Sequence, residues 1–253
     1  DLDLSYRAQL AGWKFLFLPE VEVPAELPVE INAFKSQQHR WTKGAVQTAR
    51  KILPRVWRSP VPLAVKIEAT FHLTANSTYL LMLAMALLML PVFEIRAELD
   101  WRQRMFIIDL PLFSMATMAI SGFYLVSQKA LYVDWKKQIK FLPALMAIGI
   151  SLCINNARAV LEALVGHQSS FRRTPKYGAG KKRITGRKYV GAKTLLAGVE
   201  MSMAVYFATI LQEAWSVGLY FGIPFLLLFQ TGFLYTGILS AFQPWIMQKG
   251  LRS

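Results

Sequence analysis

Long apolar stretches divide the chain into a mixed N-terminal part and a membrane-like remainder. Residues 69–93 contain no Asp, Glu, Lys or Arg, and about 20 apolar residues are enough to cross a bilayer as a helix. Similar stretches predict further spans at about 105–128, 194–212 and 214–242. The sequence therefore predicts a mainly α-helical, polytopic membrane protein with about four transmembrane helices.

A shorter apolar run at 141–154 is followed by the polar residues Asn155, Asn156 and Arg158. This length suits an interfacial or re-entrant helix, which we place at about 141–164. The polar residues at its end are expected to reach toward lipid headgroups.

The loops on either side of this helix support that placement. The loop 165–193 has nine basic and no acidic residues, and 129–140 has four lysines and one aspartate. Because basic loops remain in the cytoplasm, a full crossing between these two is excluded. We therefore expect four spans, with both ends of the chain on the cytoplasmic side.

Residues 1–60 are water-facing, with nine basic and six acidic residues. A short helix opened by Asp1 or Asp3 is expected to end at Gly12. Residues 13–18 are typical of a buried strand, and the prolines of 19–28 favour an extended chain. An amphipathic helix is predicted over 31–52.

Composition limits the function classes further. The chain combines a net charge of +14 with 54% hydrophobic residues, which excludes a disordered basic tail. The positive charge is explained by cytoplasmic loops, so no nucleic-acid partner is expected. The single cysteine, Cys153, cannot form an internal disulfide or a zinc site. Since the first residue is Asp1 and not Met, we expect a piece of a longer protein.

Three residues in the predicted helix 31–52 form the strongest local pattern. Gln37, Arg40 and Trp41 lie at i, i+3 and i+4, so an amide, a guanidinium and an indole share one side of a helix. A guanidinium can pair with a diphosphate, and an indole can stack on a sugar ring. From spacing alone, a solvated helix surface with one anchoring Trp explains the same pattern.

Several short strings together resemble a known family. They are Asp1-Leu2-Asp3-Leu4, Gly12-Trp13, Glu26-Leu27-Pro28 and Gln37-Gln38-His39-Arg40-Trp41. They resemble the end of the catalytic domain of processive family 2 glycosyltransferases, the cellulose synthases and cellulose synthase-like glucan and mannan synthases. The resemblance makes residues 1–60 the C-terminal part of a cytoplasmic α/β glycosyltransferase domain of the GT-A type, and 61–253 its membrane domain.

The resemblance also assigns roles to these residues. Asp1 occupies the position of the general base, which in the family ends a Thr/Val-Glu-Asp motif. Gln37 and Arg40 would contact the diphosphate of the donor, and Trp41 would stack on the acceptor end of the glycan. A divalent cation, Mg²⁺ or Mn²⁺, would be held by the missing upstream domain, so no metal ligand is expected in this chain and the chain alone should be inactive.

The basic loop adds a second point of resemblance. Phe171, Thr174 and Lys176 stand at the spacing of the Phe-x-Val-Thr-x-Lys gating loop of cellulose synthases, which covers the nucleotide, although Arg173 replaces Val. The other reading is a loop that only sets topology or touches acidic lipids. Glu200, inside the third predicted span, would either line a glycan path or pair within the helix bundle.

The resemblance implies a processive inverting β-glycosyltransferase that polymerises a β-glucan or β-mannan and passes it through the bilayer. Its expected partners are UDP-glucose or GDP-mannose, the growing polysaccharide and the lipid bilayer. Two alternatives stay open: a non-processive glycosyltransferase acting on a lipid acceptor, and a transporter or channel subunit without catalysis. Neither the sugar, its linkage, the oligomeric state nor accessory subunits follow from the sequence.

Overall fold

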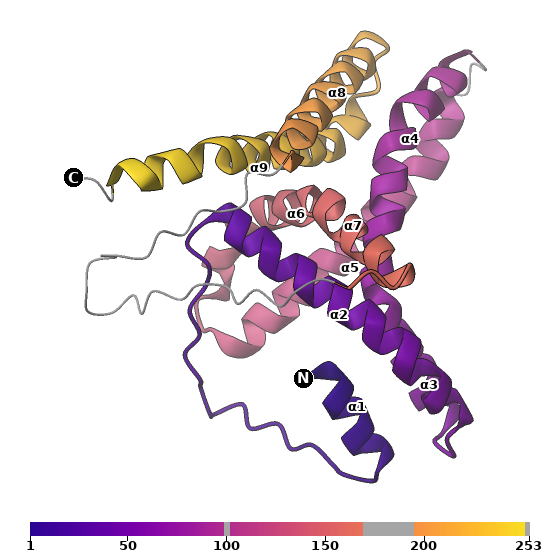
Figure 1. Cartoon of the computed structure of the whole chain (residues 1–253). Coiled ribbons are helices and arrows are strands. Elements are labelled where there is room, and N and C mark those ends of the chain that lie inside the picture. The colour runs from indigo at the N-terminus through magenta and orange to yellow at the C-terminus, as the bar shows by residue number, and fades with distance from the viewer. Residues whose placement is uncertain (99–101, 169–194, 251–253) are drawn as a thin grey trace. The chain divides into compact units, whose positions relative to one another are not determined.

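The computed structural model describes residues 1–98, 102–168 and 195–250, and these are mainly helical (Figure 1). The helices are α1 (Leu2–Leu10), α2 (Ile31–Arg58), α3 (Leu63–Thr74), α4 (Thr78–Glu98), α5 (Arg102–Leu131), α6 (Leu142–Ser151), α7 (Cys153–Leu164), α8 (Leu196–Ser216) and α9 (Ile223–Gly250), with short 3₁₀ helices η1 (Ala75–Ser77), η2 (Trp135–Phe141) and η3 (Tyr220–Gly222). The chain forms two compact units. Of the described residues, the first unit comprises 1–83, 153–168 and 243–250, and the second comprises 84–98, 102–152 and 195–242.

The first helix is confirmed as predicted. Asp1 lies at the N-cap of α1, and Gly12, with φ of 90°, follows its C-terminal end. A left-handed backbone of this kind ends a helix and favours glycine, since it has no Cβ.

The strand predicted at 13–18 is wrong. The described residues contain no strand, and a strand requires a neighbour to pair its backbone groups. Residues 13–28 are instead irregular, with a turn at Pro19 and Glu20, and Trp13, Leu16 and Phe17 are 73%, 83% and 84% exposed. The apolar run therefore lacks, within the described residues, the sheet against which it would be buried.

Helix α2 is the central element of the first unit. It continues past the predicted end at Ile52 to Arg58, with an exposed Pro54 inside it. Ile52 and Val56 of α2 form a core with Leu73 of α3. Apolar residues of α1 pack on the same core, namely Leu2, Tyr6 and Leu10.

In the second unit, a tyrosine compensates for a proline in a helix. Pro91 of α4 has no N–H to donate, so the carbonyl of Leu87, one turn earlier, lacks its helical partner. The hydroxyl of Tyr206, on α8, donates to that carbonyl at 2.8 Å and accepts from the N–H of Leu90 at 3.0 Å. Helix α8 is thereby fixed to the interrupted turn of α4.

Helices α8 and α9 pack through a stack of rings and one polar contact. The ring of Phe207 stacks on Phe229 and Phe233, with centroids 4.9 and 5.8 Å apart. Near one end of this interface, the hydroxyl of Ser240 lies 3.1 Å from the carboxylate of the buried Glu200. Of the two readings of Glu200, the described contacts favour pairing within the helix bundle.

Two glycines of α9 allow close approach of its neighbours. A Cβ on Gly232 would lie 2.2 Å from the carbonyl oxygen of Ala147 on α6, and one on Gly237 would lie 2.9 Å from the sulfur of Met201 on α8. Small residues at such crossings are typical of helices packed in membranes.

Three helical stretches among the described residues are long and apolar enough to cross a membrane, namely Leu63–Ile95, Leu110–Leu131 and Tyr220–Ile246. The number rises to four if the bent pair Trp135–Ser151 and Cys153–Leu164 is counted as one span. Helix α8, which covers the predicted span 194–212 from Leu196 on, is not among the three, because Glu200, Gln212 and Glu213 lower its mean hydropathy. The helix predicted at 141–164 is interrupted at Leu152, which separates α6 from α7.

Candidate functional site

The residues Gln37, Arg40 and Trp41 lie on α2, outside the side that packs against α7. Each residue step turns about 100° around a helix axis, so Gln37 and Trp41 share one side and Arg40 lies between that side and the α7 side. Trp41 is 60% exposed, while Gln37 and Arg40 are partly buried. The predicted arrangement of amide, guanidinium and indole on one helix is therefore present, with its indole accessible.

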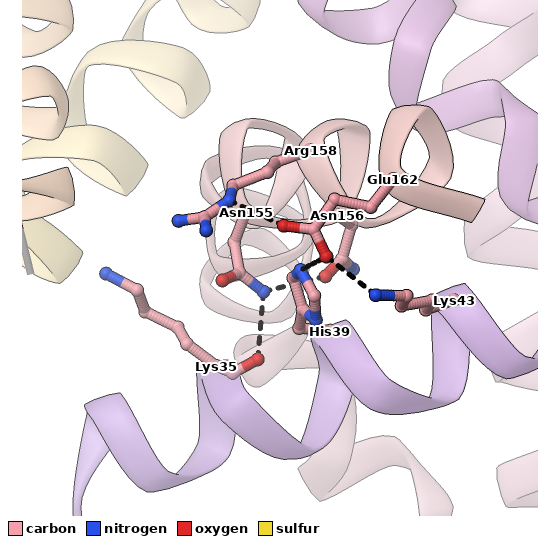
Figure 2. A network of polar contacts seen from close by, with 7 residues as sticks. All are labelled: Lys35, His39, Lys43, Asn155, Asn156, Arg158 and Glu162. Carbon is pink, nitrogen blue, oxygen red and sulfur yellow. Dashed lines mark hydrogen bonds and ion pairs between the residues drawn. The ribbon is translucent and has the colours of Figure 1, made fainter. Parts of the chain in front are cut away.

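The opposite side of α2 packs against α7 (Figure 2). The residues that make this contact recur at helical spacing: Lys35, His39, Lys43, Val46 and Arg50. Val46 packs on Val160 and Ala163 in a small apolar cluster. The same stretch of α2 thus carries the motif on one side and its anchor to α7 on the other.

Glu162 is the centre of the polar network between these helices (Figure 2). Its Oε2 accepts from Nζ of Lys43 at 3.0 Å and lies 3.4 Å from Nε2 of His39. Its Oε1 accepts from Nε of Arg158, one turn earlier on α7, at 2.9 Å. Since the Glu162 side chain is only 16% exposed and that of Lys43 only 7%, this ion pair is weakly screened by solvent.

Burial keeps His39 in its neutral form. Desolvation lowers the pKa of His39 below its usual value, and the charges of Arg158 and Lys43 lower it further, whereas Glu162 raises it. The imidazole is therefore neutral near pH 7, and the charges of this network come from Glu162 and its two cationic neighbours.

The ends of the α2–α7 contact are held by backbone groups. A guanidinium nitrogen of Arg50 donates to the carbonyls of Ala163 and Leu164, at 2.6 and 3.0 Å. These carbonyls belong to the last turn of α7, where intrahelical donors are missing. At the other end, the side-chain amide of Asn155 donates to the carbonyl of Lys35 at 2.8 Å.

The expectation that the polar residues of α7 reach lipid headgroups is wrong for Asn155 and Asn156. Both side chains are buried, and the amide of Asn155 also donates to Oδ1 of Asn156 at 2.9 Å. An uncharged amide can be buried when it finds partners on the neighbouring helix, and α2 supplies one. Arg158 does remain 65% exposed, while still binding Glu162.

A glutamine from the far end of the chain fixes the start of α2. Oε1 of Gln243 accepts from the N–H of Ile31 at 2.9 Å, and its Nε2 donates to the carbonyl of Val29 at 3.0 Å. The N–H of Ile31 is one of the first-turn donors that have no partner inside the helix. Helix α2 is thus held at its start by Gln243 and along one side by α7.

Asp1 does not contact the motif residues among the described interactions. Helix α1 packs beside the C-terminal half of α2, where Oδ1 of Asp3 lies 3.0 Å from Nζ of Lys51. Lys51 is ten residues from Trp41 along α2, which corresponds to about 15 Å at the helical rise. The structure therefore brings Gln37, Arg40 and Trp41 together, and it places Asp1 apart from them.

The remaining candidate residues give no further geometry. Phe171, Thr174 and Lys176, with most of the loop 165–193, lie outside the described residues. Among the described residues, no group of three or more His, Cys, Asp or Glu side chains is arranged to hold a metal ion. The described part of the chain therefore offers no fit for the divalent cation.

Sequence reasoning missed Glu162, Lys43 and Gln243 as residues that position the motif helix. A signal for the first two was available, because Lys35, His39 and Lys43 recur every four residues and Arg158 stands one turn before Glu162. No signal could have found Gln243, whose partners are 212 and 214 residues away.

The N-terminal half of the chain is related to a family of sugar-transferring enzymes. Residues 1–126, which include α1 to α4 and the motif, match the family described as glycosyl transferase family group 2. The predicted resemblance to family 2 glycosyltransferases is thereby confirmed. No solved structure matches the chain.

Plant mannosyltransferases are among its relatives. Over 59 residues the chain is 48% identical to glucomannan 4-beta-mannosyltransferase 7 of Arabidopsis thaliana, covering 23% of this chain and 11% of that protein. Over 73 residues it is 48% identical to glucomannan 4-beta-mannosyltransferase 1 of Oryza sativa subsp. japonica, covering 28% of this chain and 14% of that protein. The matched segments thus span about a tenth to a seventh of these relatives.

Proposed function

We propose that the protein is a processive inverting glycosyltransferase that extends a β-linked mannan or glucan from a nucleotide sugar at the cytoplasmic side of a membrane. The observation that carries this proposal is the exposed Trp41 on the same helix as Gln37 and Arg40, within the stretch related to family 2 glycosyltransferases. The apolar helices support a membrane location.

In the proposed reaction, an acceptor hydroxyl oxygen attacks the anomeric carbon of the donor sugar, and the bond from that carbon to the diphosphate breaks. The nucleoside diphosphate leaves with the electron pair, and a carboxylate takes the hydroxyl proton. Attack opposite to the leaving group converts an α-linked donor into a β-linked product.

The chain's own residues divide this work by their chemistry. The guanidinium of Arg40 and the amide of Gln37 would bind oxygens of the donor diphosphate. The exposed ring of Trp41 would hold the terminal sugar of the acceptor by stacking, which fixes the attacking hydroxyl. On the resemblance alone, Asp1 is assigned as the base, and Phe171, Thr174 and Lys176 are assigned to the donor.

A divalent cation belongs to this proposal only as a group held outside the described residues. When bound, such a cation would neutralise charge on the leaving diphosphate. Since the described residues do not offer its ligands, we derive no step through it.

The test uses membranes from cells that express the full-length protein. The membranes receive labelled GDP-mannose or UDP-glucose with Mg²⁺ or Mn²⁺, and label is read as polymer and as lipid-extractable product. Replacement of Trp41 by Ala should abolish polymer, while Trp57→Ala serves as the matched control, since Trp57 is a second exposed tryptophan on α2.

The outcomes separate the candidate functions. Polymer made from one donor and lost only in Trp41→Ala supports a processive synthase and identifies its sugar. Label confined to lipid would indicate a non-processive enzyme. No turnover of either donor would contradict the proposed catalysis and leave the transporter hypothesis to be tested.

A further inference from the structure

We propose that Glu162 is a positioning residue for glycosyl transfer: its contacts with α2 set the rotation of that helix that directs Gln37 and Trp41 away from α7 and places Arg40 beside them. This inference rests on the proposed function and deepens it. Glu162 does not touch the motif residues in any described contact, so its effect on them would be transmitted through α2.

The spacing of the contacts supports this role. His39 and Lys43, the two α2 side chains that meet Glu162, lie one turn apart and flank Arg40 and Trp41 in the sequence. Because α2 is a continuous helix, fixing His39 and Lys43 on one side fixes the direction of the residues between them. The orientation of Arg40 and Trp41 on α2 is therefore set by the carboxylate of Glu162 on α7, which contacts the other side of the helix.

The apolar part of the interface specifies this rotation less sharply. Val46, Val160 and Ala163 form the apolar part of this contact, and apolar burial is not directional, unlike a hydrogen-bonded ion pair. A buried polar contact is more selective, because a wrong rotation would place the cation of Lys43 against apolar residues of α7. Polar groups within otherwise apolar helix interfaces are known to specify register in this way.

The neighbouring contacts restrict other movements. Arg50 and Asn155 join the two ends of the interface through backbone carbonyls, which set how far the helices overlap. Glu162 acts between these ends, at the level of the motif. Loss of its carboxylate should consequently leave the helices associated and let the motif turn out of alignment.

The experiment compares Glu162→Ala and Glu162→Gln in the full-length protein, per mole of folded enzyme in membranes. We expect Glu162→Ala to lower kcat about tenfold or more, with the KM for the donor changed less than about twofold, because misalignment of bound reactants acts on the chemical step. Glu162→Gln keeps one acceptor oxygen, replaces the other with an amide donor and removes the charge, and should give an intermediate loss. Asp134→Asn, which removes the carboxylate of an exposed ion pair with Lys137, is the matched control and should leave kcat unchanged.

A second arm restores the rotation without the carboxylate. Val46→Cys and Val160→Cys are introduced together in a Cys153→Ala background and oxidised with copper phenanthroline. Since both positions are buried, disulfide formation is followed as the loss of maleimide labelling after quenching and unfolding, with each single-cysteine variant as a control. In Glu162→Ala the disulfide should form more slowly than with Glu162 present. Once formed, it should restore most of the lost kcat, and reduction should abolish the gain.

Each failure has a distinct meaning. Glu162→Ala with wild-type kcat, a change confined to KM, or a formed disulfide that restores nothing would overturn the positioning role. If Glu162→Ala does not accumulate as folded protein, Glu162→Gln takes its place with the same criteria. If the wild-type protein turns over neither donor, the proposed function fails, and equal disulfide rates with and without Glu162 would then overturn this inference separately.

Discussion

Replacement of Gly232 by Ala should destabilise the second unit, although alanine is the better helix former. Gly232 lies within α9, where α6 passes over it, and an added Cβ would lie 2.2 Å from the carbonyl oxygen of Ala147 and 2.9 Å from its carbonyl carbon. Both atoms belong to the backbone of α6. The clash cannot therefore be relieved by a side-chain rotation, and the helices must move apart.

The size of the effect follows from this distance. Non-bonded carbon and oxygen atoms prefer separations of about 3.5 Å, so α6 and α9 must separate by roughly 1 Å at the crossing. Overpacking of this kind typically costs about 1–3 kcal/mol. The gain of Ala over Gly inside a helix, about 1 kcal/mol, offsets part of this cost. Where a glycine has no close neighbours, replacement by Ala has no packing cost, and only the gain in helix propensity remains.

Gly149 provides the matched control, because it lies on α6, two residues from Ala147, and a Cβ there would meet nothing within 4 Å. The assay heats the detergent-purified full-length protein and measures the monodisperse fraction by size-exclusion chromatography. Gly232→Ala should lower the midpoint by several degrees, and Gly149→Ala should leave it unchanged or raise it. Gly237→Ala should fall between them, since its closest neighbour is the flexible end of Met201. A midpoint for Gly232→Ala equal to that of Gly149→Ala would refute the close approach of α6 and α9.

Two further outcomes are expected in the first unit. Acidification from pH 7.5 to 5.5 should lower the thermal midpoint of unfolding. Burial, Arg158 and Lys43 keep the pKa of His39 below 6.5 although Glu162 raises it, so the unfolded chain binds the proton more readily than the folded chain and acid favours unfolding. In His39→Asn this part of the pH dependence should be absent, and a profile equal to that of the wild type would contradict the prediction. Ile52→Ala removes a fully buried side chain from the core shared by α1, α2 and α3 and should cost about 2–5 kcal/mol of stability, seen as a lower midpoint; a midpoint equal to the wild type would show that this core does not form.

Capping residues and prolines in the sequence are enough to predict where the first two helices begin and where the first one ends. Asp1 and Gly12 bound the first helix, and the proline-free stretch from Ile31 predicts the second. The predicted helix 31–52 ends before Pro54, since a proline interrupts helical hydrogen bonding. Helix α2 in fact continues to Arg58, since Val56 packs in the core with Leu73 and thereby stabilises the last turns.

Long-range contacts explain most of what the sequence could not predict. The strand expected at 13–18 depends on a pairing partner that a local pattern cannot supply. The burial of Asn155 and Asn156 depends on α2 lying beside α7, and the contact of Tyr206 with Leu87 depends on α8 lying beside α4. In each case the burial or the hydrogen bonding of a residue is decided by a segment that is distant in the sequence, and the local composition does not reveal that segment.

Helix α2 of the candidate site contains residues that the local sequence predicts and residues whose role depends on a distant helix. The spacing of Gln37, Arg40 and Trp41 predicts that they lie close together on one helix, and their chemistry suits a sugar nucleotide. His39 and Lys43 alternate with them in the sequence, yet both face α7 and contact Glu162 there, and the backbone carbonyl of Lys35 accepts from Asn155. Substitutions of Gln37, Arg40 or Trp41 should therefore affect the proposed ligand contacts, whereas substitutions of His39 or Lys43 should affect the anchor. Separating these two groups requires helical phase as well as the motif string, since residues adjacent in sequence, such as His39 and Arg40, belong to different sides of α2.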